Sequence, residues 1–164
     1  MGDRTFCRIE VAPDNEAQKA VLVDYGFDND FGDHEGEFAD SEANYGGLET
    51  IDELKALALP FVGSHDEGGD YSATVFAFDG KDFAQVASVD QLPAVTVSES
   101  GALGGLDDAT EYWRIYKAAK AVIDAAVKAV DDTESAPVRL GDAIGQDENA
   151  PEINDEDGED EANA

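Results

Sequence analysis

Alternating apolar and polar residues near the start of the chain predict its first strand. Thr5, Cys7, Ile9 and Val11 alternate with Phe6, Arg8 and Glu10. A period of two is typical of a strand that has one buried face. Residues 19–25 form a second apolar run after a turn-forming segment, and two such runs commonly pair. We therefore predict an antiparallel hairpin over residues 4–25.

Residues 26–47 show no regular hydrophobic period, and we expect a long loop there. The segment is rich in glycine and acidic residues, and it also contains Phe27 and Phe31. A loop of this length inside a compact domain is uncommon and is usually either functional or mobile. Because large aromatic side chains are seldom left in water, we expect Phe27 and Phe31 to pack on the body or on a partner. They are therefore candidate interface residues.

A capping box and a helical period predict a short helix over residues 51–58. Thr50 and Glu53 have the spacing of a capping box at a helix N-terminus. Apolar residues then recur at helical spacing until Pro60, which cannot continue a helix.

Asp79 and Gly80 lie between two apolar runs and predict a second hairpin. An Asp-Gly pair favours a tight hairpin turn, because both residues tolerate a positive φ. We expect its strands at residues 73–78 and 81–89. Residues 94–98 are expected to add one more strand and to complete a meander over residues 73–98.

The longest predicted element is a helix over residues 109–130. Its apolar positions recur with the helical period at Trp113, Tyr116, Ala119, Ile123, Ala126, Val127 and Val130. Asp108 would cap this helix, with Glu111 three residues later. Together these patterns predict an α+β fold with antiparallel hairpins, one short helix and one long C-terminal helix.

The chain has 164 residues, which is enough for one domain with a single core. We assign residues 1–131 to this domain. Residues 132–164 contain few large apolar side chains and many acids. We therefore expect them to form an acidic tail that is disordered unless a partner orders it.

The charge balance is extreme, with 39 Asp and Glu residues against 10 Lys and Arg residues and a formal net charge of -29. The acids are spread along the chain, so the predicted domain is itself acidic. Affinity for phosphate backbones and anionic membranes comes mainly from cationic side chains. We therefore expect neither nucleic acid nor membrane as a partner. Other protein subunits are expected instead, a second copy of the chain among them.

Two explanations fit so acidic a protein. Molar salt shortens the Debye length to about 3 Å, so an acidic fold tolerates its own repulsion in a salt-accumulating cell. The composition, with few lysines and more Asp than Glu, is similar to that of halophilic proteins. The second explanation is mimicry of a nucleic-acid backbone. We favour salt adaptation because no regular spacing of acids on one helix stands out, whereas the low number of arginines keeps mimicry open.

Four acids in the expected loop, Asp28, Asp30, Asp33 and Glu35, are weak candidates for a calcium or magnesium site. Such ions take six or more oxygen ligands. The spacing fails the EF-hand pattern, because Gly32 occupies a ligand position. Acid clusters arise by chance in so acidic a chain, so a solvated loop is favoured and no cofactor is predicted.

His34 and His65 are the two histidines, and each lies in an acidic segment. Either could join carboxylates in a zinc site or act as a general base, with Ser64 beside His65. The chain has neither a nucleophile elbow nor a His-Glu-x-x-His motif. We therefore favour ordinary loop histidines, expect Cys7 to be a small core residue, and predict a protein that is not an enzyme.

Tyr112, Trp113 and Tyr116 cluster on the first turns of the long helix, where they either pack in the core or anchor an interface. The expected function is that of a structural or interaction subunit of a larger assembly in a high-salt host, a virus particle being one example. The alternative is an acidic nucleic-acid mimic that inhibits a DNA-processing enzyme. The N-terminus lacks the apolar core of a signal peptide, so we expect the chain in the cytoplasm or within an assembled particle.

Overall fold

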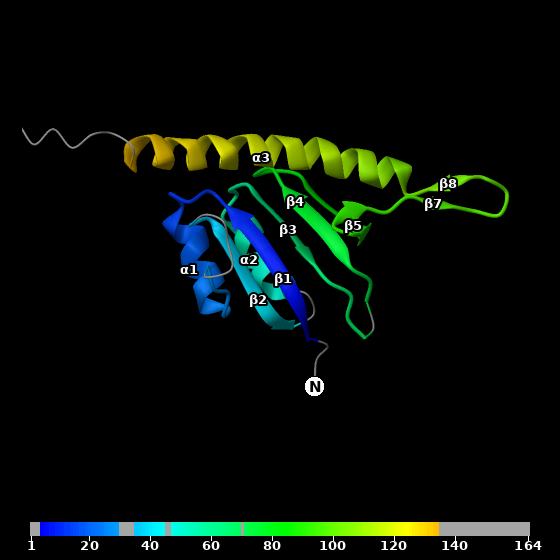
Figure 1. The fold of residues 1–164 in the computed structure, drawn as a ribbon, viewed down its shortest axis with the longest axis horizontal. Coiled ribbons are helices and arrows are strands. Elements are labelled where there is room, and N and C mark those ends of the chain that lie inside the picture. The colour runs from blue at the N-terminus through cyan, green and yellow to red at the C-terminus, as the bar shows by residue number, and fades with distance from the viewer. Residues whose placement is uncertain (1–3, 30–34, 45–46, 70, 135–164) are drawn as a thin grey trace, which may run out of the picture.

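The computed structural model describes residues 4–29, 35–44, 47–69 and 71–134, and the structural statements below concern these residues. They form a six-stranded antiparallel sheet with helices on both faces (Figure 1). The strands are β1 (Arg4–Val11), β2 (Glu37–Asn44), β3 (Phe61–His65), β4 (Thr74–Phe78), β5 (Phe83–Val89) and β6 (Leu92–Pro93). Their order in the sheet is β2-β1-β3-β4-β5-β6. The α+β class is therefore confirmed.

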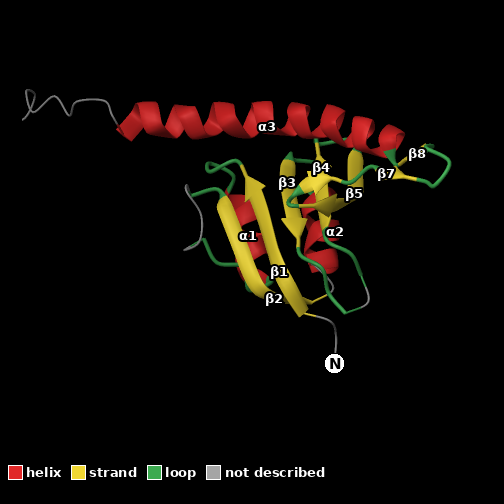
Figure 2. Cartoon of the chain, turned by 45° about the vertical axis from the view of Figure 1, so that its right-hand side comes forward, coloured by secondary structure: helices red, strands yellow, loops and turns green. Residues whose placement is uncertain are grey.

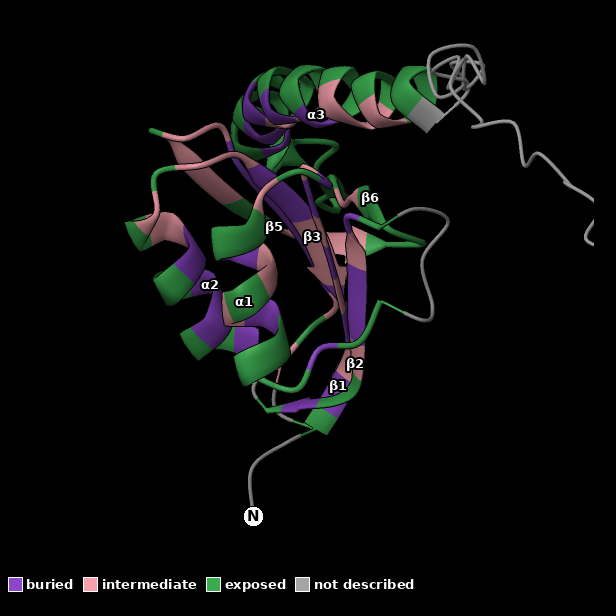
Figure 3. Cartoon of the chain, turned by 90° about the vertical axis from the view of Figure 1, so that its left-hand side faces the viewer, coloured by how far each residue is buried: buried purple, intermediate pink, exposed green. Residues whose placement is uncertain are grey.

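Two short helices and one long helix cover the sheet. Helices α1 (Glu16–Asp24) and α2 (Leu48–Ala56) lie together on one side of it, and α3 (Leu106–Glu134) crosses the opposite face (Figure 3). Successive residues of a strand point to opposite faces, so Phe61 faces the short helices and Val62 faces α3.

Each face of the sheet therefore has a core of its own. The core under the short helices contains Cys7, Ile9, Val11, Leu22, Phe27, Phe38, Ala43, Ile51, Leu54, Phe61, Phe76 and Phe78. The core under α3 contains Val62, Val75, Ala77, Tyr112, Ile115, Ala119 and Ile123. The first strand predicted from the sequence, residues 4–11, is confirmed as β1.

The predicted hairpin over residues 4–25 is wrong, because its second half is α1. The Asn15 side chain accepts a hydrogen bond from the Gln18 backbone N–H and so caps the helix. Gln18 and Leu22, four residues apart, are the buried positions of this helix. The apolar run that suggested a strand therefore lies on a helix, and tertiary contacts override its local preference.

The strand that pairs with the outer edge of β1 is β2, which lies within the loop expected over residues 26–47. Only Phe38, Ala39 and Ala43 of β2 are buried, because the strand lies at the edge of the sheet. Its remaining side chains are polar, so the strand shows no clear alternation of apolar and polar residues. The expected long loop was wrong for this reason.

The helix predicted over residues 51–58 is confirmed as α2, which begins earlier and ends at Ala56. The helix begins at Leu48, after Gly47, whose φ of 75° is one that glycine adopts without strain. Thr50 is therefore buried inside the helix and does not form the predicted capping box.

The predicted second hairpin is confirmed as β4 and β5, which pair from Phe78 and Phe83 outwards. Four residues connect them instead of the expected two, and only Gly80 of this loop has a positive φ. The strand expected at residues 94–98 is confirmed only at Thr96–Val97, which forms β7. It does not extend the meander, because it pairs with β8 (Leu103–Gly104) outside the main sheet.

The predicted long helix is confirmed as α3, which is longer at both ends than residues 109–130. It begins at Leu106, so Asp108 lies in its first turn and not at the predicted cap. An acid in the first turn still stabilises the helix, because its negative charge interacts favourably with the helix dipole. The helix includes residues 132–134 of the predicted tail, whereas residues 135–164 lie outside the described residues.

Arg114 connects α3 to the loop between β4 and β5. Its guanidinium donates to the carboxylate of Asp82 over 2.9 Å and lies 3.7 Å from that of Asp79. Asp79 Oδ1 in turn accepts the backbone N–H groups of Lys81 and Asp82, at 3.0 and 2.8 Å. Burial alone would raise the pKa of Asp79, but these donors and Arg114 outweigh burial and lower it.

Replacing Asp79 by alanine should lower the free energy of unfolding by about 1 kcal/mol at neutral pH, because two backbone donors lose their acceptor. Since the folded-state pKa is depressed, this stabilisation is present above the ordinary carboxyl pKa and is lost as the pH falls through the folded value. The difference between the wild type and D79A, measured by urea unfolding, should therefore shrink below about pH 4. D79N keeps the Oδ1 acceptor, so its free energy of unfolding should fall by less than that of D79A. If the difference between the wild type and D79A does not change with pH, this account is contradicted.

Candidate functional site

A small hairpin projects from the body of the protein beside the start of α3 (Figure 2). Its strands β7 and β8 pair with Thr96 opposite Gly104 and Val97 opposite Leu103. We call residues 94–105 the arm. Figures 1 and 2 both show the arm extending beyond the N-terminal end of α3 and away from the main sheet.

Hydrogen bonds within the arm close its tip. The backbone N–H of Ser98 donates to the carbonyl of Ala102 over 2.9 Å, and the N–H of Ala102 donates to Ser98 Oγ over 3.0 Å. The N–H of Gly101 donates to the Ser98 carbonyl over 2.8 Å. Gly101 has a φ of 80°, which glycine adopts readily. The turn is thus closed by hydrogen bonds among its own residues.

One face of the arm is apolar and exposed. Val97 and Leu103 lie directly opposite each other, so their side chains share a face. Val95 lies just before β7 and is a third exposed apolar side chain of the arm. Val95, Val97 and Leu103 are 40%, 68% and 58% exposed. We call these three side chains the apolar face of the arm.

The arm carries almost no charge. Glu99 is its one charged residue, in a chain of which 30% of the residues are charged. Every residue from Val95 to Gly105 is exposed. Burial therefore does not explain why charge is missing here, as it does in a buried strand. An exposed apolar surface rimmed by polar residues is typical of an interaction site, which makes the arm the candidate functional site.

Exposed apolar side chains also lie on the first turns of α3, which follows the arm in the chain. Leu106, the first residue of the helix, is exposed, and Trp113 lies seven residues later on the same side. A hollow of about 610 Å³ beside Trp113 is also lined by Thr110, Arg114 and Lys117. Trp113 is 37% exposed, and it is the one member of the predicted aromatic trio that is classed as exposed.

The other predicted interface residues lie deeper in the protein or outside its described part. Tyr112 is buried against the sheet and Tyr116 is half-buried beside it, and burial raises the pKa of both phenols. Phe27 is buried in the core under the short helices. Phe31 lies outside the described residues. An interface role for this set remains a prediction, and of its described members Trp113 is the most accessible.

The described candidates for a metal site are not brought together. The backbone of Asp28 pairs with Ala39 of β2 at 2.9 and 2.8 Å, whereas Glu35 lies 3.8 Å from the ammonium group of Lys19. Among the residues that the structure describes, no group of three or more His, Cys, Asp and Glu side chains could hold a metal ion. Asp30 and Asp33 lie outside these residues.

The candidate catalytic groups are also separate. Ser64 and His65 are neighbours on β3 and therefore point to opposite faces of the sheet. His65 is buried, packs edge-on against Tyr71, and has its Nδ1 2.9 Å from the Asp66 carbonyl. Cys7 is buried in the core as expected, and burial raises the pKa of its thiol. His34 lies outside the described residues.

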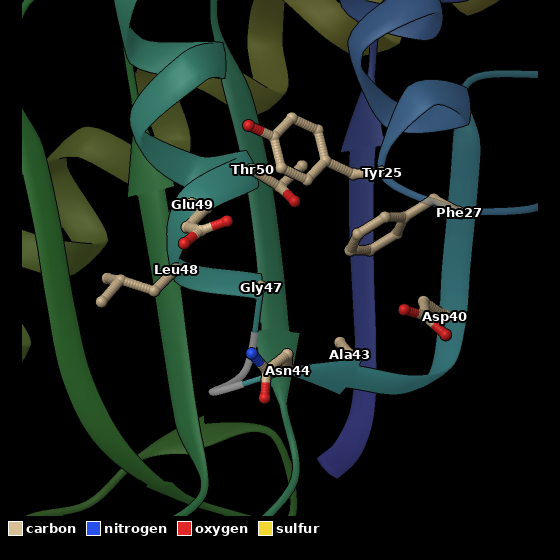
Figure 4. A pocket seen from close by; sticks show the side chains of 9 residues that line it. All are labelled: Tyr25, Phe27, Asp40, Ala43, Asn44, Gly47, Leu48, Glu49 and Thr50. Carbon is tan, nitrogen blue, oxygen red and sulfur yellow. The ribbon is translucent and has the colours of Figure 1, made fainter. Parts of the chain in front are cut away.

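Two pockets on the body are smaller than most ligand sites. One has a volume of about 160 Å³ and lies between the end of α1, β2 and the start of α2 (Figure 4). Asp40 and Glu49 lie on opposite sides of it, and the neighbouring residues 45–46 are outside the described part of the chain. The other has about 190 Å³ and lies between α3 and the sheet, beside Arg8 and Tyr116. Small-molecule sites usually have about 300–1,000 Å³, so both pockets are smaller than such sites. A more open hollow of about 720 Å³ between α1 and β2 falls within that range.

The sequence pattern favoured aromatic residues as interface anchors and did not indicate the apolar face of the arm. The signal that could have revealed it was the near absence of charge over residues 91–106, which include a single acid. Other uncharged stretches, such as residues 71–78, correspond to buried strands. Exposure distinguishes the two cases, and it is known only once the chain is folded.

Among the described helices, none combines the length and the apolar character needed to cross a membrane. No family model matches the chain, and neither the curated proteins nor the solved structures compared with it gave a match.

Proposed function

We propose that this chain is a non-enzymatic subunit of a protein assembly in a high-salt host, in which the arm contacts a neighbouring subunit. The exposed apolar face of the arm is the observation that carries the proposal. A virus particle is one assembly that would suit such a subunit.

The arm is a weak structure in isolation, and this supports a role in contact with another protein. A lone two-stranded hairpin is at best marginally stable in water. Its exposed valine and leucine side chains each keep apolar area in water, at a cost of about 25 cal/mol per Å². A neighbouring subunit that covers this face would remove that cost and also order the hairpin.

The surroundings of the candidate catalytic residues support a non-enzymatic role. Ser64 and His65 face opposite sides of the sheet, and the buried Cys7 thiol has a raised pKa that disfavours the reactive thiolate. Among the described residues, the His, Cys, Asp and Glu side chains form no group of three or more that could hold a metal ion. The exposed arm is better suited to binding a protein surface than these groups are to chemistry.

Leu103→Asp should release the chain from its assembly. The aspartate places a charge on the apolar face, where it would be buried without a partner. Leu48, at the start of α2, is a similarly exposed leucine far from the arm, so Leu48→Asp is the matched control. The measurement is size-exclusion chromatography, in molar KCl, of gentle extracts from the cells or particles in which the chain occurs.

The wild type and L48D are expected to elute together in a complex, and L103D as a monomer. A monomeric wild type, or a complex that L103D leaves intact, would contradict the proposed function. Circular dichroism of each variant would show that the exposed substitutions leave the fold unchanged.

A further inference from the structure

We infer that the neighbour bound by the arm is a second copy of this chain, which meets it apolar face to apolar face. This inference rests on the proposed function and names its partner. The observation that carries it is the contrast between the nearly uncharged arm and the -29 chain to which it belongs.

An uncharged contact surface does not repel a partner that carries the same charge as the rest of the chain. A cationic partner would gain most by binding where acids are dense, and α1 and α2 offer such surfaces with Glu16, Asp24, Glu49, Asp52 and Glu53. A partner that is itself strongly acidic would be repelled there, since like charges placed together oppose binding. The arm removes this repulsion, because Glu99 is its one charged residue and lies in the tip. The contact surface is therefore suited to a partner of the same sign.

A second copy of the chain is the acidic partner that is present wherever the chain is present. Two identical subunits usually meet around a twofold axis, with the same patch on both sides. The apolar face suits this arrangement, because Val95, Val97 and Leu103 have no charge or polar group that would need a different partner. Projection of the arm away from the main sheet also keeps the two acidic bodies apart (Figure 1).

The salt dependence of binding distinguishes this inference from binding to a cationic partner. Screening weakens attraction between opposite charges and weakens repulsion between like charges. Self-association through the arm should therefore strengthen as KCl is raised from dilute buffer to molar concentration. Binding of a cationic partner should weaken over the same range.

Val97→Asp tests the contact in the purified full-length chain. Sedimentation velocity over a wide range of protein concentration in molar KCl should show a dimer for the wild type. V97D should weaken dimerisation at least about a hundredfold, because the contact would bury unpaired charge from both copies. Val97→Thr, which keeps the shape and adds no charge, should weaken it by a smaller factor, about tenfold.

Val23 provides the matched control, because it is a similarly exposed valine on α1, away from the arm. V23D adds the same charge to the chain, so it should dimerise as the wild type does. Circular dichroism in the same salt would verify that all variants are folded.

A monomeric wild type in molar KCl, or a V97D dimer as stable as that of the wild type, would overturn the inference. So would a dimer that weakens as KCl rises. Suppose that the purified chain is monomeric, but that in native extracts L103D dissociates from the complex that the wild type forms. The partner is then a different protein, and the proposed function stands. If the native complex is also independent of the arm, both proposals fail.

Discussion

Replacing Phe61 by alanine should lower the free energy of unfolding by about 3–5 kcal/mol, the range found when a buried phenylalanine is truncated. Phe61 lies on the central strand β3, is fully buried and faces the two short helices. Its ring centroid lies 5.4 Å from that of Phe78, 6.3 Å from that of Phe76 and 6.4 Å from that of Phe83. The substitution therefore removes the shared contact of an aromatic cluster as well as buried area. A domain of this size has a total stability of only about 5–15 kcal/mol, so the loss would be a large part of it.

Phe83 provides the comparison within the same cluster. It has the same side chain and contacts the same ring, but it is half-buried on β5 and also contacts the Lys55 ammonium group, 4.8 Å from its ring centroid. F83A should therefore cost about 1–2 kcal/mol, less than F61A. Unfolding is best followed in urea at constant molar KCl, because guanidinium chloride would itself change the screening. If F83A costs as much as F61A, Phe61 is not the centre of the core.

The elements that were predicted correctly are those whose information is local. The alternation in β1, the Asp79-Gly80 signal of the second hairpin and the apolar period of α3 all lie within the segments that they describe. The structure of α1 depends on a distant contact as well. The side-chain amide of the buried Gln18 donates to the backbone carbonyls of Leu59 and Pro60, at 3.1 and 3.2 Å. No pattern within residues 16–24 could reveal those acceptors.

The edge strand β2 was missed for a related reason. A strand that pairs on one side and meets solvent on the other can carry Ser41 and Glu42 without cost, so its sequence looks like a loop. The sequence of β8 in the arm does not reveal a strand either. This strand contains glycine and few β-forming residues, and it is defined by its pairing with β7. The candidate site was therefore not predictable from propensity, although the missing charge over the arm was visible in the sequence.

Raising KCl from dilute buffer to molar concentration should stabilise the folded chain, on the order of 5 kcal/mol and thus by much of the stability of a small domain. Folding brings the many acids of the domain close together, and their mutual repulsion opposes the compact state. Many described cations already have a nearby acid, in the pairs Arg4–Glu42, Arg8–Glu37, Lys19–Glu16, Lys55–Asp52, Arg114–Asp82 and Lys120–Glu10. Ions from solution must therefore supply much of the remaining screening.

Screening by salt also weakens these ion pairs. This loss of stability is smaller than the gain from screening the repulsion among the acids. Exposed pairs contribute about 0–1 kcal/mol each, so their loss cannot cancel relief from the repulsion of the whole acidic body. The dependence on concentration gives a sharper test. The Debye length is already about 3 Å at 1 M salt, so screening should have its full effect by that concentration. A further rise in the free energy of unfolding above 1 M KCl would come from exclusion of the salt from the protein surface and not from screening.

Circular dichroism and urea unfolding as functions of KCl concentration measure this effect, with sucrose as the control. Sucrose stabilises proteins by exclusion but carries no charge, so it should not reproduce the steep gain at low KCl. A cooperative gain of structure in KCl alone would account for the charge without any partner and would support the high-salt host in the proposed function. If the chain is equally stable in dilute buffer, salt adaptation fails and the acids need another explanation. Mimicry of a nucleic-acid backbone would then become the leading hypothesis, and retention of DNA-binding enzymes on the immobilised chain at low salt would test it.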